Sequence, residues 1–181
     1  MVGVCILLAT ALPFSELDYK VIADYDFEEL TNTGGNSIDI TANFSARVPG
    51  FSGDKIYIPA NTNGVLQISS SSKRGHLIYS NENVGSDCTM FIRASKMHKT
   101  PIKTNISIGP YGESPSGLAT NVTVTFEMDW LEPVPLSAVA PDGSIIIQPN
   151  DETETESNRR ILIDRIIFAR KREHGFYFII R

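Results

Sequence analysis

Cysteine, basic charge and long apolar runs are all scarce in this chain of 181 residues. The two cysteines, Cys5 and Cys88, are too few for a disulfide framework or a zinc site. The formal net charge of -5 argues against a non-specific nucleic-acid binder, which needs a basic face. No apolar run reaches the roughly 18 residues of a membrane-spanning helix. Hydrophobic residues at 41% nevertheless indicate a globular domain with a core rather than a disordered chain.

The residues that are abundant favour β structure. Ser, Thr and Asn are common, and Ile and Val outnumber Leu, which suits a pleated, half-buried surface. Strand patterns bounded by turn residues recur over ranges 20–27, 50–59, 65–69, 76–80, 88–94, 103–109, 121–130, 144–148 and 160–169. Because no βαβ alternation and no convincing helix is present, we predict an all-β fold. It is an antiparallel β-sandwich of jelly-roll type with about nine to eleven short strands.

The clearest strand pattern covers residues 121–130, NVTVTFEMDW. Apolar and polar residues alternate strictly over this stretch, with Trp130 on the apolar face. Such alternation is typical of a strand with one face on the core and one in solvent. We therefore expect a single uninterrupted strand here.

Residues 1–19 contain an apolar stretch followed by the small-x-small sequence Ala9-Thr10-Ala11. This pattern is typical of a signal peptide, although the basic segment that normally precedes the apolar stretch is lacking. A buried first strand and a lipid anchor on Cys5 are the alternatives. On the signal-peptide interpretation, residues 20–181 form one exported domain, and the protein is extracytoplasmic: secreted, periplasmic or on the cell surface.

Residues 50–80, GFSGDKIYIPANTNGVLQISSSSKRGHLIYS, resemble a segment of secreted Bacteroidetes β-sandwich modules. The opening segment Tyr25–Glu28 and the closing strand Ile161–Ile166 are similar to those of jelly-roll modules related to galactose-binding and carbohydrate-binding domains. The resemblance implies an exported, non-catalytic module that binds a glycan, within a larger surface protein that has a neighbouring domain. A structural or adhesive surface module without a sugar ligand is the alternative.

The same resemblance implies a structural calcium ion where the first and last strands meet. Calcium takes six to eight oxygen ligands, which loop carbonyls and a few carboxylates supply. Asp26, Glu28 and Asp164 occupy the corresponding positions. Modules of this kind carry a second Asp after Asp164, where this chain has Arg165. An ion pair between Arg165 and either Asp164 or Glu28 is therefore the alternative to a metal.

The spacing of Glu127, Asp129 and Glu132 resembles the catalytic strand of a jelly-roll family of retaining glycoside hydrolases. Retaining hydrolysis needs a nucleophile and an acid about 5 to 5.5 Å apart. On that model Glu127 is the nucleophile, Asp129 supports it and Glu132 is the acid. The single Trp of the chain and the strand-ending Pro133 and Pro135 disfavour the model. We rank it behind the binding and adhesive hypotheses, so the protein is predicted not to be an enzyme.

Glycan binding needs exposed aromatic faces beside planar polar groups. The candidates on loops or strand ends are Tyr57, Tyr79, Tyr111 and Trp130. Tyr111 is expected to be the most exposed of them because it lies between Pro110 and a glycine. An ordinary place in the core or at its rim is the alternative for each.

Two short basic segments are further candidates, for contact with an anionic glycan. They are Lys96–Lys99 and Arg170–Arg172, and a solvated loop is the alternative for both. The last apolar stretch, Phe176–Ile180, either adds a strand or begins another module.

Overall fold

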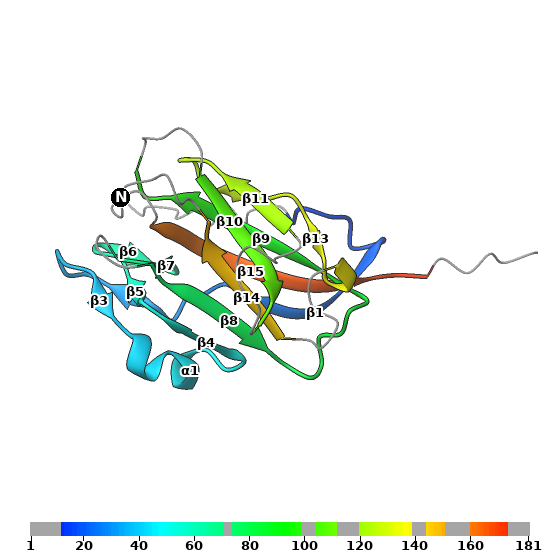
Figure 1. The fold of residues 1–181 in the computed structure, drawn as a ribbon, viewed down its shortest axis with the longest axis horizontal. Coiled ribbons are helices and arrows are strands. Elements are labelled where there is room, and N and C mark those ends of the chain that lie inside the picture. Colours follow the sequence, from blue (N-terminus) through cyan, green and yellow to red (C-terminus); the bar gives the residue numbers. More distant parts are fainter. Residues whose placement is uncertain are drawn as a thin grey trace, which may run out of the picture.

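The computed structural model describes residues 12–70, 74–98, 104–111, 120–138, 144–150 and 160–173. Within these ranges the chain forms two antiparallel sheets, and the five-stranded sheet lies over the eight-stranded one in Figure 1. The predicted all-β sandwich is thereby confirmed. The acidic run 151–157, the small-x-small sequence Ala9–Ala11 and the stretch Phe176–Ile180 lie outside the described residues.

The eight-stranded sheet is built around the longest strand of the described chain, β15 (Ile161–Lys171). Its order is β12 (Asp129–Trp130), β9 (Cys88–Lys96), β15, β7 (Leu66–Ile68), β5 (Ile56–Ile58) and β3 (Ile38–Asp39). Two further strands join it: β1 (Tyr19–Tyr25) pairs with β15, and β13 (Val134–Pro135) pairs with β9.

The five-stranded sheet has the order β11 (Thr120–Val124), β10 (Thr104–Pro110), β14 (Ser144–Pro149), β8 (His76–Ser80) and β4 (Phe51–Asp54). A two-residue ribbon pairs β2 (Thr31–Asn32) with β6 (Thr62–Asn63). The helical segments described are single turns, η1 (Thr41–Asn43), α1 (Phe44–Arg47) and η3 (Leu136–Ala138), and none is a candidate to span a membrane.

The number of strands longer than two residues agrees with the nine to eleven strands predicted from the sequence. Fifteen strands are labelled in the described chain, and five of them (β2, β3, β6, β12 and β13) have two residues each, which leaves ten longer ones. The chain also changes sheet repeatedly, for example from β8 to β9 and from β14 to β15. This alternation between layers is that of a jelly roll.

Strand alternation explains where the core lies. In β10 and β14 the inward residues Ile106, Ile108, Ile145 and Ile147 are fully buried, as are Ile163 and other inward residues of β15. Burying apolar surface stabilises the sandwich by about 25 cal/mol per Å² removed from water. The side chains on the two outward faces are not part of this core, and the candidate sites lie on these faces.

The predicted single turn-and-strand over residues 50–59 is in fact two strands on opposite sheets. β4 pairs with β8 in the five-stranded sheet, whereas β5 pairs with β7 in the eight-stranded sheet. The change of direction occurs at Lys55, whose φ of 56° is left-handed. Gly53 permits the close approach of β8, because a Cβ there would lie 2.4 Å from the carbonyl oxygen of His76.

The prediction of one uninterrupted strand over residues 121–130 is wrong. β11 ends at Val124 in the five-stranded sheet, and β12 begins at Asp129 in the eight-stranded sheet. Between them the chain bends from one layer to the other, so Phe126 is 43% exposed despite its place in the alternation. The alternation of apolar and polar residues continues across a corner of the sandwich. Such alternation shows which residues share a face of a strand, but it does not show to which sheet each half of the segment belongs.

The end of the predicted signal segment packs on the domain. Phe14 lies 4.5 Å from Phe91 between ring centroids and 5.2 Å from Tyr19. Leu12, Phe14, Tyr19 and Trp130 together surround the small buried cluster of Phe91, Ile167 and Ala169. This cluster sits on the outward face of the eight-stranded sheet, so described residues before 20 belong to the sandwich.

Candidate functional site

The structure separates the four aromatic residues that the sequence proposes for a glycan site. Tyr79 is fully buried and stacks on Phe168 with ring centroids 4.2 Å apart. Burial, followed by the hydrogen bond to the Tyr25 hydroxyl, raises the pKa of Tyr79 well above its ordinary value. The prediction that Tyr79 presents a face to a ligand is therefore wrong, and its alternation with buried Leu77 on β8 is the signal that places it inside.

Two of the remaining aromatics lie on the eight-stranded sheet. Trp130 pairs with Arg93 in register and is half-buried against the cluster around Phe91. Tyr57 is half-buried on β5, between Gln67 on β7 and Asp39 on β3. Tyr111, in contrast, follows β10 of the five-stranded sheet and is 57% exposed. The four residues therefore do not form one platform.

The three carboxylates of the lower-ranked glycoside hydrolase hypothesis do not share a strand face. Glu127 lies in the bend between β11 and β12, Asp129 begins β12, and Glu132 lies in the connection to β13. All three side chains are exposed. Asp129 Oδ1 accepts a hydrogen bond from the Trp130 backbone N–H at 2.8 Å, which holds it as a local turn residue. The arrangement of one strand with converging acids is absent at this place.

Two of the three predicted calcium ligands, Asp164 and Asp26, are engaged in other contacts. Arg93 Nη1 lies 2.5 Å from Asp164 Oδ2, and Arg165 donates to both carboxylate oxygens of Asp24 at 2.9 and 2.7 Å. Asp26 accepts the Glu28 backbone N–H at 3.2 Å. No group of three or more His, Cys, Asp or Glu side chains among the described residues is placed to hold a metal. The predicted calcium site is therefore not confirmed.

The alternative prediction, that Arg165 forms an ion pair, is confirmed, but the acidic partner differs from the predicted ones. Arg165 pairs with Asp24 on β1 rather than with Asp164 or Glu28. A β-bulge between Ile163 and Arg165 turns both Asp164 and Arg165 toward the outward face of β15, which gives each its own partner. Burial raises the pKa of Asp164 above its ordinary value, and the Arg93 charge opposes that rise.

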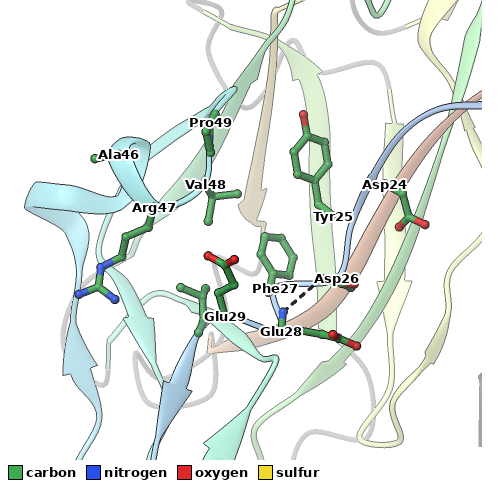
Figure 2. Close-up of a pocket in the computed structure, with 11 residues that line it drawn as sticks. Asp24, Tyr25, Asp26, Phe27, Glu28, Glu29, Ala46, Arg47, Val48 and Pro49 are labelled. Atoms are coloured by element: carbon green, nitrogen blue, oxygen red, sulfur yellow. Dashed lines mark hydrogen bonds between the residues drawn. The ribbon is translucent and has the colours of Figure 1, made fainter. Parts of the chain in front are cut away.

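A pocket of about 340 Å³ lies beside this region, between the β1–β2 connection and α1. Asp26, Glu28 and Glu29 line it together with Phe27, whose φ is 56°. Figure 2 shows Glu29 directed toward the space between the two segments, whereas Arg47 points away from it. The carboxylates that line this pocket come from one short stretch of chain. Among the described residues they do not form a group that could hold a metal ion.

The basic segment at residues 96–99 is only partly the expected loop. Lys96 ends β9 and is buried, so the solvated alternative is wrong for this residue. His98 Nε2 contacts Arg160 Nη2. Burial lowers the pKa of His98, and the charges of Arg160 and Lys96 lower it further. Lys99 lies outside the described residues.

The outward face of the five-stranded sheet carries a network of amides and hydroxyls that the sequence reasoning missed. Asn121 Oδ1 accepts hydrogen bonds from Ser107 Oγ at 2.6 Å and from Asn150 Nδ2 at 2.8 Å. One rung away, Thr123 Oγ1 donates to Asn105 Oδ1 at 3.2 Å. The registers Asn105 with Thr123 and Ser107 with Asn121 bring these side chains together across β10 and β11. We call Asn105, Ser107, Asn121, Thr123, Gln148 and Asn150 the amide face.

Gln148 extends the amide face onto β14, where its register partner is Ser107. The Gln148 side chain is only 7% exposed, and its Nε2 has no hydrogen-bond partner among the described residues. A buried donor without a partner costs about 1–3 kcal/mol relative to the same group in water. Such a group calls for a physical reason, and an acceptor supplied by a bound ligand is one.

Tyr111 stands on the same side of the sheet as the amide face. Because Ile106 and Ile108 point into the core, Asn105, Ser107, Gly109 and Tyr111 alternate to the outside. The ladder continues past β10, since the Tyr111 N–H donates to the Ser144 carbonyl at 3.2 Å. Ser107 and Gly109 are buried, whereas Asn105 and Tyr111 at the two ends of this row are exposed.

The amide face can supply hydrogen-bond donors without supplying charge. The oxygens of Asn105 and Asn121 are engaged within the network, so among the described residues their Nδ2 groups and Gln148 Nε2 are the donors that remain. The alternating polar residues 105 and 107, and again 121 and 123, are the sequence signal for this face. Only the register of the strands, however, shows that they meet.

No family model and no curated protein matches the sequence. Among solved structures, a CBM36 carbohydrate-binding module in complex with calcium and xylotriose is 12% identical, with a TM-score of 0.37 over 81% of this chain and 99% of that chain. The N-terminal cellulose-binding domain of Cellulomonas fimi β-1,4-glucanase C is 14% identical, with a TM-score of 0.39 over 81% of this chain and 100% of that one.

A third similar structure is the CBM22-1–GH10 part of Clostridium thermocellum xylanase 10B complexed with xylohexaose. It is 14% identical with a TM-score of 0.43, over 82% of this chain and 30% of that chain. All three identities and TM-scores are low, so the similarity is one of β-sandwich architecture. The function is therefore argued from the residues of this chain.

Proposed function

We propose that this protein is a non-catalytic carbohydrate-binding module whose ligand lies along the amide face. The observation that carries the proposal is the buried Gln148 Nε2, which has no partner among the described residues and lies within a hydrogen-bonded array of neutral amides and hydroxyls. Sugar hydroxyl and ring oxygens are neutral acceptors, so they match the donors of this face. Tyr111 adds an exposed ring against which the apolar CH groups of a sugar can pack.

The dimensions of the face suit an extended ligand. Six residue steps separate Asn105 from Tyr111, which corresponds to about 20 Å along a strand. A chain of several sugar units lying parallel to β10 would contact the ring of Tyr111 at one end and the amides at the other.

We place the module outside the cytoplasm and within a larger surface or secreted protein. The support for this placement is the apolar stretch followed by Ala9-Thr10-Ala11 and the resemblance of residues 50–80 to secreted modules. The adhesive alternative predicts an exposed apolar patch. The large exposed hydrophobic residues that the structure describes are Leu17, Val21, Ile38, Tyr111 and Phe126.

The test is Gln148→Leu, measured by calorimetric titration with neutral hexasaccharides of glucose, xylose and mannose. Leucine has a similar size and removes a donor that the fold does not use, so the free energy of unfolding should stay the same or rise. The affinity for the best-bound hexasaccharide should fall about 10-fold or more, since a lost hydrogen bond of about 1.4 kcal/mol corresponds to that factor.

Gln67→Leu is the matched control. Gln67 is 3% exposed and has a buried Oε1 without a hydrogen-bond partner among the described residues, but it lies on the other sheet. This variant should retain full affinity. The proposal is wrong if no neutral hexasaccharide binds, or if Gln67→Leu weakens binding as much as Gln148→Leu does.

A further inference from the structure

A pocket with mostly cationic walls lies where β1 begins and β15 ends. Its volume is about 490 Å³, and the residues that line it are Lys20, Arg170, Lys171, Arg172, Asp87 and Glu173. In Figure 1 the red end of β15 extends to the rim of the sandwich, away from β3 and α1. The sequence marks Arg170–Arg172 as a basic segment, and the fold adds Lys20 and a hollow to it.

The strand register forces two of these cations together. Lys20 on β1 is the direct partner of Arg170 on β15, and Tyr19 is the partner of Lys171. Like charges placed directly opposite each other on paired strands destabilise a sheet. The backbone bond from the Arg172 N–H to the Asp18 carbonyl, at 2.7 Å, prolongs the pairing and keeps a further cation at the same place.

Four cationic and two acidic residues line the pocket, so its lining keeps a net positive charge. The one ion pair recorded among its lining residues joins Arg170 Nε to Asp87 Oδ2 at 2.5 Å. Arg172 Nε donates to the Tyr19 carbonyl at 3.2 Å, which fixes its position without cancelling its charge. Lys20, Lys171 and Arg172 therefore line one hollow, in which Glu173 is the further acid. A hollow lined mainly by one sign of charge concentrates the potential and attracts the opposite charge.

We propose that this pocket binds the carboxylate or sulfate substituents of an acidic glycan. The inference rests on the proposed function in taking a glycan as the ligand, but it uses residues that the amide face does not contain. An arginine offers a planar pair of donors that matches carboxylate and sulfate oxygens, and the lysines add point charges. The anion would relieve the repulsion between Lys20 and Arg170.

The charge of the whole chain favours a glycan over other polyanions. The formal net charge is -5, so the protein outside this pocket repels an extended anionic surface. Double-stranded DNA carries a charge about every 1.7 Å and needs a continuous basic face. A glycan with separated acidic groups can place one of them in the pocket while its hydroxyl groups contact neutral surface.

The test compares Lys20→Gln/Lys171→Gln with the unmodified protein in calorimetric titrations. The probes are tetragalacturonate, its neutral methyl ester, sulfated dextran oligosaccharide and unsulfated dextran oligosaccharide. The unmodified protein should bind at least one acidic probe 10-fold or more tightly than its neutral counterpart, and less tightly as salt rises from 50 to 200 mM. The double variant should lose that preference and keep its affinity for the neutral hexasaccharides.

The matched control is Arg47→Gln/Lys55→Gln, which changes the net charge equally at α1 and at the β4–β5 corner. It should leave the preference intact, and thermal unfolding should verify that both variants fold. The inference is overturned if neither acidic probe is preferred or if the control loses the preference equally. It is also overturned if anionic lipid vesicles or duplex DNA bind more tightly through Lys20 and Lys171.

The two proposals fail in different ways. If neutral hexasaccharides bind, Gln148→Leu abolishes this binding and no acidic probe is preferred, only the proposal for the pocket at Lys20 and Arg170 is wrong. An acidic preference lost in Lys20→Gln/Lys171→Gln, together with no neutral binding, removes the amide face as the glycan site and keeps the pocket. Binding of neither kind of probe removes both.

Discussion

The two outward faces of the sandwich use the same strand geometry for opposite purposes. On the eight-stranded sheet, Phe91, Ile167 and Ala169 are covered by side chains of the same protein, including Phe14 and Trp130. On the five-stranded sheet, the corresponding positions hold the amide face, whose donors are satisfied only in part. The first face is covered by the protein itself, whereas the second keeps a buried amide donor that has no partner among the described residues.

The polar groups of the two faces differ in the same sense. The eight-stranded sheet pairs its charges within the protein, Arg93 with Asp164 and Arg165 with Asp24. The amide face carries no charged side chain, so it exerts no long-range attraction on a charged ligand. A face that completes its own interactions contributes to stability, whereas a face with donors left over contributes to binding.

Removing the covered aromatic ring should produce the largest effect. Phe91 is 2% exposed, so Phe91→Ala should lower the free energy of unfolding by about 3–5 kcal/mol. Urea denaturation measures this loss. Affinity for neutral hexasaccharides should stay unchanged under conditions where the variant is folded. A large fall in affinity would mean that the two faces are not separate in function.

Removing the exposed ring should have a smaller effect on a different property. Tyr111→Ala should lower glycan affinity about 10-fold, which corresponds to about 1.4 kcal/mol, because the ring packs against a sugar. The free energy of unfolding should change by no more than about 0.5 kcal/mol at this exposed position. Tyr57→Ala is the control on the other sheet and should bind normally. Equal losses for both variants would contradict the assignment of the ligand to one face.

The smallest predicted effect is a pH dependence of stability that comes from Asp164 on the eight-stranded sheet. The pKa of Asp164 is raised by burial, so the folded state holds its proton to higher pH than the unfolded state does. Its contribution to stability is therefore present below the unfolded pKa of about 3.9 and is lost as pH rises through the folded pKa.

Asp164→Asn should remove this dependence. The difference in unfolding free energy between the unmodified protein and Asp164→Asn should shift against the unmodified protein as pH rises from about 4. Urea denaturation across this pH range measures the shift. A difference that moves in the opposite direction would mean that Arg93 dominates the titration of Asp164 instead of burial.

Much of the fold could be predicted from local pattern, because alternation and turn residues act within single strands. The range 76–80 is predicted and observed identically as β8, and 144–148 differs from β14 by one residue. The failure at 121–130 arises where a period-two pattern passes from one sheet to the other. No local pattern carries the position of a corner between layers.

The candidate site could be predicted only in its parts. Tyr111 is correctly expected to be exposed. The alternation of Tyr79 with Leu77 indicates that Tyr79 points inward, but its partners Phe168 and Tyr25 are distant in sequence. The polar alternation in β10 and β11 is visible in the sequence, but the hydrogen bonds of Asn121 depend on strand register. The pairing of Lys20 with Arg170 joins the two ends of the domain and has no local signal either.

The most direct test of the central claim is to map a neutral hexasaccharide on the folded protein by amide chemical-shift changes in NMR spectra. The account predicts that the largest changes fall on β10, β11 and β14 and at Tyr111, with little change on β5, β9 and β12. It predicts the same map at low and high salt, because the amide face is neutral. Changes centred on Tyr57 or Trp130 would contradict it, since they would place the ligand on the face that the protein covers itself.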